Sequence, residues 1–214
     1  MTTRALAIHV CADAETRGLR RTWPPAFAAN DTVQRAQRIC ERSGVVEQRT
    51  LAGDQATAAA LRGALDHAAA VLIHGGLLVV TFTGHTERGD GPIETARWCL
   101  VGGGMMLSQI ADHLARLPPS ARLVIIADTC YAAAIARCLR GAQLAVVVAS
   151  CGEDQTMIER ARSEFVVRLE DLVCADPARS IDELRAALEA DTPDCERPVV
   201  WTNAADRWPS EAFA

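Results

Sequence analysis

LLVVTFTGH at residues 77–85 and LVIIADTCY at residues 123–131 are the strongest indications of the fold in this sequence. Each begins with a continuous apolar run rich in β-branched residues, which is typical of a strand buried on both faces of a parallel sheet. A third run, LAVVVA at residues 144–149, has the same apolar character. The three runs predict the centre of a parallel sheet.

The rest of the chain alternates between helical and strand patterns. The sequence predicts further strands at residues 5–10, 45–51 and 199–202 and helices at residues 31–43, 54–74, 107–117, 132–139, 165–173 and 181–190. Asp31 or Asn30 is the expected N-cap of the first of these helices, and Asp54 that of the second. Strands that alternate with helices indicate an α/β fold with a mostly parallel sheet, in a single domain over residues 1–214.

Composition excludes several classes of protein. Half of the 214 residues are hydrophobic, which excludes a wholly disordered chain. A net charge of -5 and a pI near 5.6 argue against a nucleic-acid partner and against a membrane surface, because both need a basic face. No apolar stretch has the length of a membrane helix, and the N-terminus lacks the pattern of a signal peptide. We therefore expect a cytoplasmic protein.

The reactive side chains directly follow the apolar runs at residues 77–82 and 123–127. One run leads into Thr83-Gly84-His85 and the other into Asp128-Thr129-Cys130. Functional groups of open α/β sheets collect beyond the carboxyl ends of strands, so neighbouring strands would bring His85 and Cys130 together. A thiol beside an imidazole is the pair needed for covalent acyl transfer.

Each residue taken alone has a simpler explanation. The chain has eight cysteines without a CxxC pair, which argues against a zinc ribbon, and most should be small buried residues. A single histidine is usually a surface or core residue. The joint position of His85 and Cys130 at two strand ends, 45 residues apart, is what favours a catalytic pair.

With these motifs the sequence resembles the caspase-like cysteine peptidases of the metacaspase and paracaspase branch, in a bacterial form. LLVVTFTGH is similar to that family's strand ending in Ser-Gly-His, and LVIIADTCY to its strand ending in Asp-x-Cys-His. ASCGEDQTMIE at residues 149–159 resembles the segment after the next strand, and Asn30-Asp31 an Asn-Asp-Ala at the first helix. The resemblance implies a three-layer sandwich with a mostly parallel six-stranded sheet flanked by helices.

The sequence departs from the family pattern at several positions. Thr86 stands where glycine usually follows the histidine, Tyr131 replaces a histidine, and Ala132-Ala133 replace Ser-Gly. None of these changes removes a catalytic atom. The short segment after Cys130 leaves no room for the long cleavable linker of animal caspases, so an uncut chain is expected to hold the complete site.

The resemblance also implies residue roles. Cys130 would be the nucleophile and His85 the general acid and base, while the backbone N–H groups of Gly84 and Cys130 would form the oxyanion hole. Glycine suits position 84 because the substrate must approach the backbone closely. No cofactor is expected. Because no EF-hand-like run of acids is present, we also expect no metal, calcium included.

Specificity is expected from carboxylates near the nucleophile. The family branch that carries an acid at the position of Asp128 cuts after Arg or Lys, and acids matching Asp31 and Glu159 complete its first specificity pocket. Grouped carboxylates repel unless a cation bridges them, and the guanidinium group of arginine can do this in bidentate fashion. Thr83 and Asp154 belong to the expected substrate-binding set, and Glu153 and Asp154 are both rivals of Asp31 and Glu159 as contributors to the pocket. An unneutralised Asp128 should also disfavour the thiolate of Cys130.

The acids also have simpler explanations, because Asp31 could be only an N-cap and Glu159 a solvated helix residue.

The expected partner is a protein or peptide substrate with Arg, or else Lys, at P1. An activating protease or a regulatory partner is a further expectation. Since the chain lacks lysine, self-cleavage would need an arginine, and the candidates are Arg17, Arg20, Arg21, Arg160 and Arg162.

Two other functions compete with peptidase activity. One is a catalytically inactive caspase-like scaffold or binding module. Another is a flavodoxin-like or nucleotide-binding domain, suggested by the glycine triplet at residues 102–104, although this triplet lacks a phosphate-binding pattern. A role in bacterial cell death or anti-phage defence follows from the resemblance alone.

Overall fold

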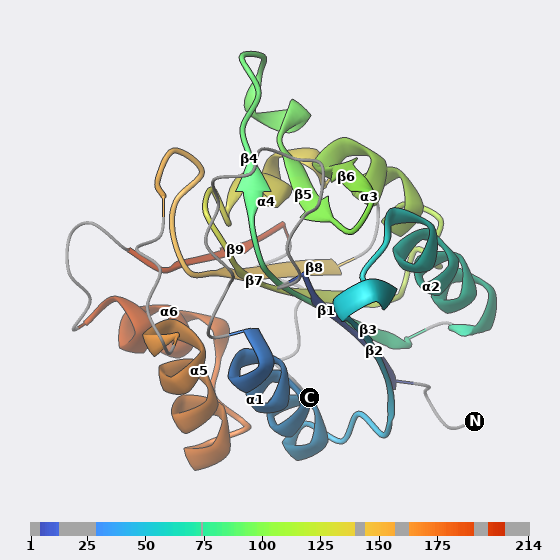
Figure 1. Cartoon of the computed structure of the whole chain (residues 1–214). Coiled ribbons are helices and arrows are strands. Elements are labelled where there is room, and N and C mark those ends of the chain that lie inside the picture. The colour runs from blue at the N-terminus through green and yellow to red at the C-terminus, as the bar shows by residue number, and fades with distance from the viewer. Residues whose placement is uncertain are drawn as a thin grey trace.

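The structure is a computed structural model of the chain (Figure 1). It describes residues 5–12, 29–73, 75–139, 144–156, 163–190 and 197–203. Glu159 and the five candidate cleavage arginines named above lie outside these ranges.

A six-stranded sheet forms the centre of the molecule, in the order β2-β1-β3-β7-β8-β9. The first five strands in this order are parallel, and β9 pairs with β8 in the antiparallel direction. The strands are β1 (Ala5–Cys11), β2 (Glu47–Ala52), β3 (Leu77–Thr83), β7 (Arg122–Asp128), β8 (Leu144–Ala149) and β9 (Val199–Thr202). Every strand predicted for this sheet is therefore present, to within one or two residues at the ends.

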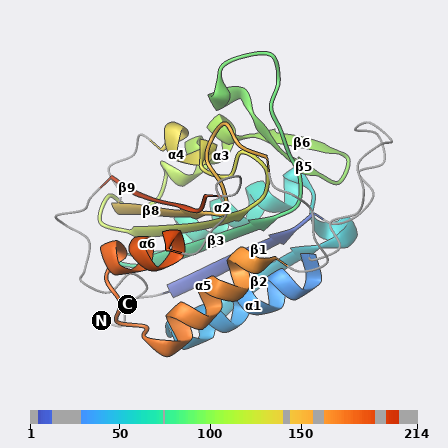
Figure 2. The ribbon, with the colours of Figure 1, turned by 90° about the vertical axis from the view of Figure 1, so that its left-hand side faces the viewer.

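Helices cover both faces of this sheet and complete a three-layer sandwich (Figure 2). The helices α1, α5 and α6 pack on one face, and α2, α3 and α4 on the other. Their bounds are α1 (Ala29–Arg42), α2 (Ala58–Val71), α3 (Leu107–Leu114), α4 (Ala134–Cys138), α5 (Glu164–Ala175) and α6 (Ile181–Glu189). The predicted α/β class with a mostly parallel six-stranded sheet is confirmed.

The side chains of the central strands point alternately to the two faces of the sheet, which divides the core into two clusters. In β3, for example, Leu78 and Val80 face α2 and α3, whereas Leu77 and Val79 face α1 and α5. Successive side chains of a strand point to opposite faces, so a strand covered on both sides must be apolar throughout. This requirement explains the unbroken apolar runs that mark the centre of the sheet.

A second, antiparallel sheet of three strands extends from the carboxyl end of β3. It consists of β4 (Thr86–Glu87), β5 (Arg97–Leu100) and β6 (Gly103–Met106), with the 3₁₀ turn η2 (Ile93–Thr95) before β5. Gly102 and Gly103 have φ of 76° and 147° at the turn between β5 and β6. Gly102 and Gly103 thus serve a hairpin turn, which needs left-handed backbone.

Two helix starts differ from those predicted. The N-cap of α2 is Thr57, whose hydroxyl accepts a hydrogen bond from the Ala60 N–H at 3.1 Å, while Asp54 lies in the preceding 3₁₀ turn η1 (Gly53–Gln55). Helix α1 begins at Ala29, so Asp31 lies inside its first turn and is not the N-cap. At the start of α2 both Asp54 and Thr57 are residue types able to cap, and packing decides which one does so.

In the order of the parallel strands the sheet reads 2-1-3-4-5, an order shared with flavodoxin-like folds. Ligands in such sheets bind beyond the carboxyl ends of the strands, near the point where the strand order reverses. Here that point lies between β1 and β3.

None of the described helices combines the length and apolar character that crossing a membrane requires.

Candidate active site

The two strands that carry the expected catalytic residues are neighbours. β3 and β7 pair in parallel, with Thr83 opposite Asp128 as the last pair of the ladder. His85 and Cys130 each follow this pair by two residues, beyond the same edge of the sheet. Both residues are partly exposed, so they lie where a substrate could reach them.

The backbone around His85 is held on two sides. The Thr83 carbonyl accepts a hydrogen bond from Ala12 N–H at 2.9 Å, which ties the end of β3 to the end of β1. The His85 carbonyl accepts one from Cys99 N–H at 2.8 Å, which ties it to β5. His85 therefore lies at the junction between the central sheet and the three-stranded sheet.

Gly84 is required at this junction by two features of the backbone. Its φ is +148°, a conformation that L side chains rarely adopt. A Cβ atom at this position would lie 3.0 Å from the Ala12 carbonyl oxygen and 3.1 Å from Ala12 Cβ. Any larger residue would push the His85 segment away from β1. Its predicted role in an oxyanion hole stays a prediction.

The turn after Cys130 has an unusual backbone. Tyr131 has φ of 54°, the one positive value among the described non-glycine residues. Its N–H donates to the Gln155 carbonyl at 2.8 Å, and the Ala133 N–H donates to the Cys151 carbonyl at 3.1 Å. Left-handed backbone in a bulky residue is costly and is found where the surroundings enforce it, often at functional sites. The turn links Cys130 to α4.

The residue before Cys130 is fixed by the segment that follows β8. The Thr129 N–H donates to Ser150 Oγ at 3.3 Å, and the Cys151 thiol donates to the Thr129 carbonyl at 3.3 Å. Burial raises the pKa of the Cys151 thiol to about 11, so this cysteine stays protonated and acts as a donor. Cys151 thus has a structural place beside the candidate nucleophile.

Asp128 lies at the end of β7 and is buried, with 8% of its surface exposed. It belongs to the sheet face covered by α1, because Thr32 of that helix donates a long hydrogen bond of 3.4 Å to Asp128 Oδ2. Thr83 Oγ1 donates to the same oxygen, also at 3.4 Å. Two hydroxyl groups therefore orient the carboxylate that is expected to define specificity.

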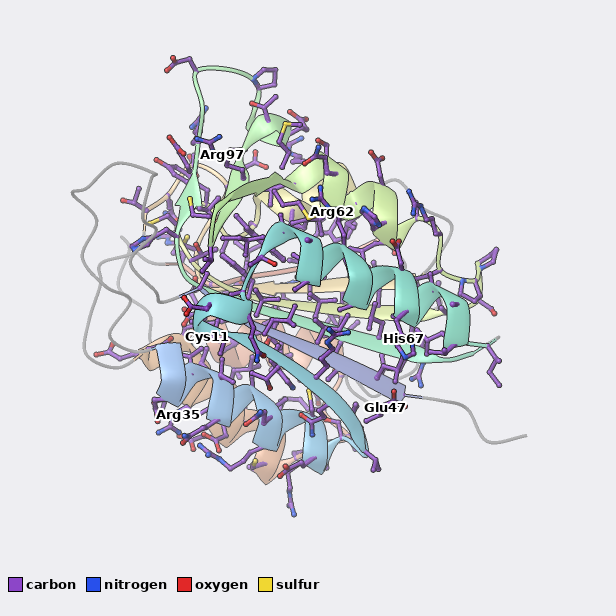
Figure 3. All side chains as sticks on the ribbon, turned by 45° about the vertical axis from the view of Figure 1, so that its right-hand side comes forward. Cys11, Arg35, Glu47, Arg62, His67 and Arg97 are labelled. Carbon is purple, nitrogen blue, oxygen red and sulfur yellow. The ribbon has the colours of Figure 1, made fainter. Side chains whose placement is uncertain are left out.

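Asp31 directly precedes Thr32, the α1 residue that contacts Asp128. Asp31 itself forms an ion pair with an arginine of the same helix. Arg35 Nε donates to Asp31 Oδ2 at 2.7 Å, one turn along α1. The same guanidinium group bonds Glu170 of α5, a helix that lies beside α1 (Figure 3). One oxygen of Asp31 is thus already committed, and its place in the specificity pocket stays a prediction.

The acids after β8 fall into different surroundings. Glu153 receives two hydrogen bonds of 2.6 Å from Arg137, one to each oxygen, and this pairing lowers the pKa of the Glu153 carboxyl. Asp154 is exposed. Arg137 thus neutralises Glu153, which weakens it as a rival for the specificity pocket.

Sequence reasoning missed the hydroxyl groups of Thr32, Thr86 and Thr129. Thr86 and Thr129 are buried, and their Oγ1 atoms lie 2.8 Å apart. Their position next to His85 and Cys130 was visible in the sequence, but the facing of the two side chains was not. For Thr32 no sequence signal was available, because its contact with Asp128 spans 96 residues.

The cysteines separate by burial. Among the described residues, Cys11, Cys40, Cys99 and Cys151 are buried, while Cys130, Cys138 and Cys174 are partly exposed. Four of the seven described cysteines are thus buried, as expected for most of them, and partial exposure does not by itself distinguish Cys130. Within the described ranges no group of three or more His, Cys, Asp or Glu side chains is placed to hold a metal ion.

Comparison with known proteins supports the fold and no more. No protein-family profile and no curated protein matches this sequence. Among solved structures, the crystal structure of protein GSU0716 from Geobacter sulfurreducens is similar, with a TM-score of 0.79 and 17% identical residues. The match covers 99% of this chain and 98% of that chain. At this identity the likeness shows that the two proteins share a three-layer α/β fold over their whole length.

Proposed function

We propose that this protein is a caspase-like cysteine endopeptidase that cleaves peptide bonds after arginine, and less readily after lysine. The observation that carries the proposal is the pairing of Thr83 with Asp128 at the ends of β3 and β7. With this register, His85 and Cys130 follow at matching positions beyond one edge of the sheet. Their partial exposure and the enforced turn at Tyr131 support a reactive site.

The proposed reaction proceeds in two steps. Cys130 Sγ, having given its proton to His85, attacks the scissile carbonyl carbon and forms a C–S bond. The C–N bond breaks, and His85 protonates the leaving amine. In the second step His85 takes a proton from water, whose oxygen attacks the thioester carbon. The C–S bond breaks, His85 returns the proton to Cys130 Sγ, and the carboxylic acid product leaves and ionises. Backbone N–H groups of Gly84 and Cys130 would stabilise the oxyanion in each step.

Asp128 is the proposed source of specificity for a basic P1 residue. Its carboxylate is buried at the end of the strand that leads to Cys130, and Thr32 and Thr83 fix it through Oδ2. A buried carboxylate is stabilised by a cation, and the guanidinium group of a substrate provides one with directional hydrogen bonds. The same argument disfavours an aspartate at P1, because two carboxylates would repel each other.

The alternative is a catalytically inactive relative that serves as a scaffold or binding module. The test is a set of fluorogenic peptides with Arg, Lys or Asp at P1, assayed on the wild type, Cys130→Ala and His85→Ala, with and without calcium. We expect Arg to exceed Lys, Asp to be inert, and both variants to lose activity. Equal activity of Cys130→Ala would overturn the proposal, and a wild type inert toward all three peptides would favour the scaffold.

A further inference from the structure

One contact joins the two loops that carry the proposed catalytic residues. Thr86 follows His85 and Thr129 precedes Cys130, and their Oγ1 atoms lie 2.8 Å apart. Both side chains are nearly inaccessible, with 3% and 2% of their surfaces exposed. Water therefore cannot readily replace either hydroxyl as the other's partner, and losing one leaves a buried polar group unsatisfied.

The two threonines are anchored to different parts of the molecule. Thr86 belongs to β4, where it pairs with Trp98 of β5. The peptide groups of Thr129 bond to Ser150 and Cys151, which follow β8. The hydroxyl contact thus connects the three-stranded sheet that supports His85 with the end of the central sheet that supports Cys130.

We infer that the Thr86–Thr129 hydroxyl pair is a positioning device that sets the relation between His85 and Cys130. The inference rests on the proposed function of these two residues. Neither threonine touches the reacting atoms in the proposed mechanism, so they act through their neighbours. A small displacement of catalytic groups costs up to about a hundredfold in rate, which makes such a device important for catalysis.

The test is a double-mutant cycle with Thr86→Val, Thr129→Val and the double variant, assayed on the Arg peptide. Valine keeps the shape of threonine and removes the hydroxyl group. We expect each single variant to lower kcat by about ten- to a hundredfold with KM changed by less than about twofold. The double variant should be no slower than the slower single variant, because residues that act as a unit are not additive.

Thr81→Val is the matched control. Like Thr86 and Thr129, Thr81 is a buried threonine, but it lies within β3, before the end of that strand at Thr83. Its hydroxyl lies 2.9 Å from Nδ1 of the buried His9. We expect Thr81→Val to keep kcat near the wild-type value, even where thermal unfolding shows a similar loss of stability. Equal losses of kcat in Thr81→Val and Thr86→Val would mean a general effect and overturn the inference.

A second comparison applies if valine is not tolerated. Thr86→Ser and Thr86→Ala both remove the methyl group, and only serine keeps the hydroxyl, so serine should retain kcat and alanine should not. The alkylation rate of Cys130 should fall in the same variants. Unchanged kcat in the hydroxyl-free variants would refute the positioning role and leave the peptidase intact. A wild type without Cys130-dependent hydrolysis would refute the proposed function and this inference together.

Discussion

Thr83 and Asp128 face each other as the last pair of the β3–β7 ladder, and the Thr83 hydroxyl donates to Asp128 Oδ2 at 3.4 Å. This pair fixes the position at which β3 and β7 end. His85 and Cys130 follow it at equal distance along the chain, and Asp128 lies buried between the sheet and α1. The proposed nucleophile, its base and the specificity carboxylate all depend on this one register.

Asp128→Asn should abolish the preference for arginine. Loss of a buried, hydrogen-bonded charge partner costs about 3 kcal/mol, so kcat/KM for the Arg peptide should fall by roughly a hundredfold or more. The fluorogenic assay measures this directly. Glu153→Gln is the control, because Arg137 already neutralises that carboxylate, and its kcat/KM should stay within about twofold of the wild type. An Asp128→Asn enzyme that still prefers Arg would refute the assignment.

Thiol alkylation should distinguish the cysteines by burial. Burial raises the pKa of Cys40 to about 12 and the pKa of Cys99 and of Cys151 to about 11, so these thiols should resist iodoacetamide at neutral pH. Peptide mass mapping over time measures each rate. Cys130 should react first, with the partly exposed Cys138 and Cys174 as internal references. Modification of Cys151 as fast as that of Cys130 would contradict this order.

A bound cation should accelerate alkylation of Cys130. An ionised Asp128 would disfavour the thiolate, and a guanidinium ion in the proposed pocket would cancel that charge. We expect a higher rate with a small arginine-like cation such as benzamidine, and no change at Cys174 in the same sample. The gain should vanish in Asp128→Asn. An equal gain in the variant would mean that the cation acts elsewhere.

The packing of α1 against α5 should depend on pH through Glu170. Arg38 first, and Arg35 as well, hold the pKa of the Glu170 carboxyl below its usual range, against the opposing effect of burial. The folded pKa is lower than the unfolded value of about 4.3, so the stabilisation is complete above that value and is lost as the pH falls below it.

Glu170→Gln should therefore lower the free energy of unfolding by about 1–3 kcal/mol at pH 7. The difference from the wild type should begin to shrink below about pH 4 and vanish only below the lowered folded pKa of Glu170, where both side chains are neutral. Urea denaturation at several pH values measures it. Asp182→Asn removes an exposed pair with Arg185 and should change stability by less than about 1 kcal/mol. A constant difference between pH 7 and pH 3 would exclude the ionic explanation.

The backbone at Tyr131 should favour glycine over alanine. With φ of 54°, alanine pays the steric cost of left-handed backbone and glycine does not, so Tyr131→Gly should be more stable than Tyr131→Ala by about 1 kcal/mol. Thermal or urea unfolding measures the difference. Ala133 has φ of -71°, so Ala133→Gly should be destabilising there. The same sign at both positions would show that backbone strain is not the cause.

Much of the fold follows from local sequence patterns. Apolar runs of strand length are readable because a strand covered on both faces can hold few polar residues, and the three central strands were predicted to within a residue or two. Helix starts were less predictable, as Asp54 and Thr57 show. Both residue types cap helices, and only the surrounding structure selects one.

The strand ends that carry His85, Asp128 and Cys130 can be predicted from the sequence, because reactive residues follow the apolar runs directly. Which side chains meet depends on the packed fold. In the folded chain Thr86 contacts Thr129, and Thr32 donates a hydrogen bond to Asp128. Asp31 forms an ion pair with Arg35, and Glu153 forms one with Arg137. Burial patterns are local and periodic, whereas hydrogen bonds and ion pairs join residues whose distance in space is set only by the packed fold.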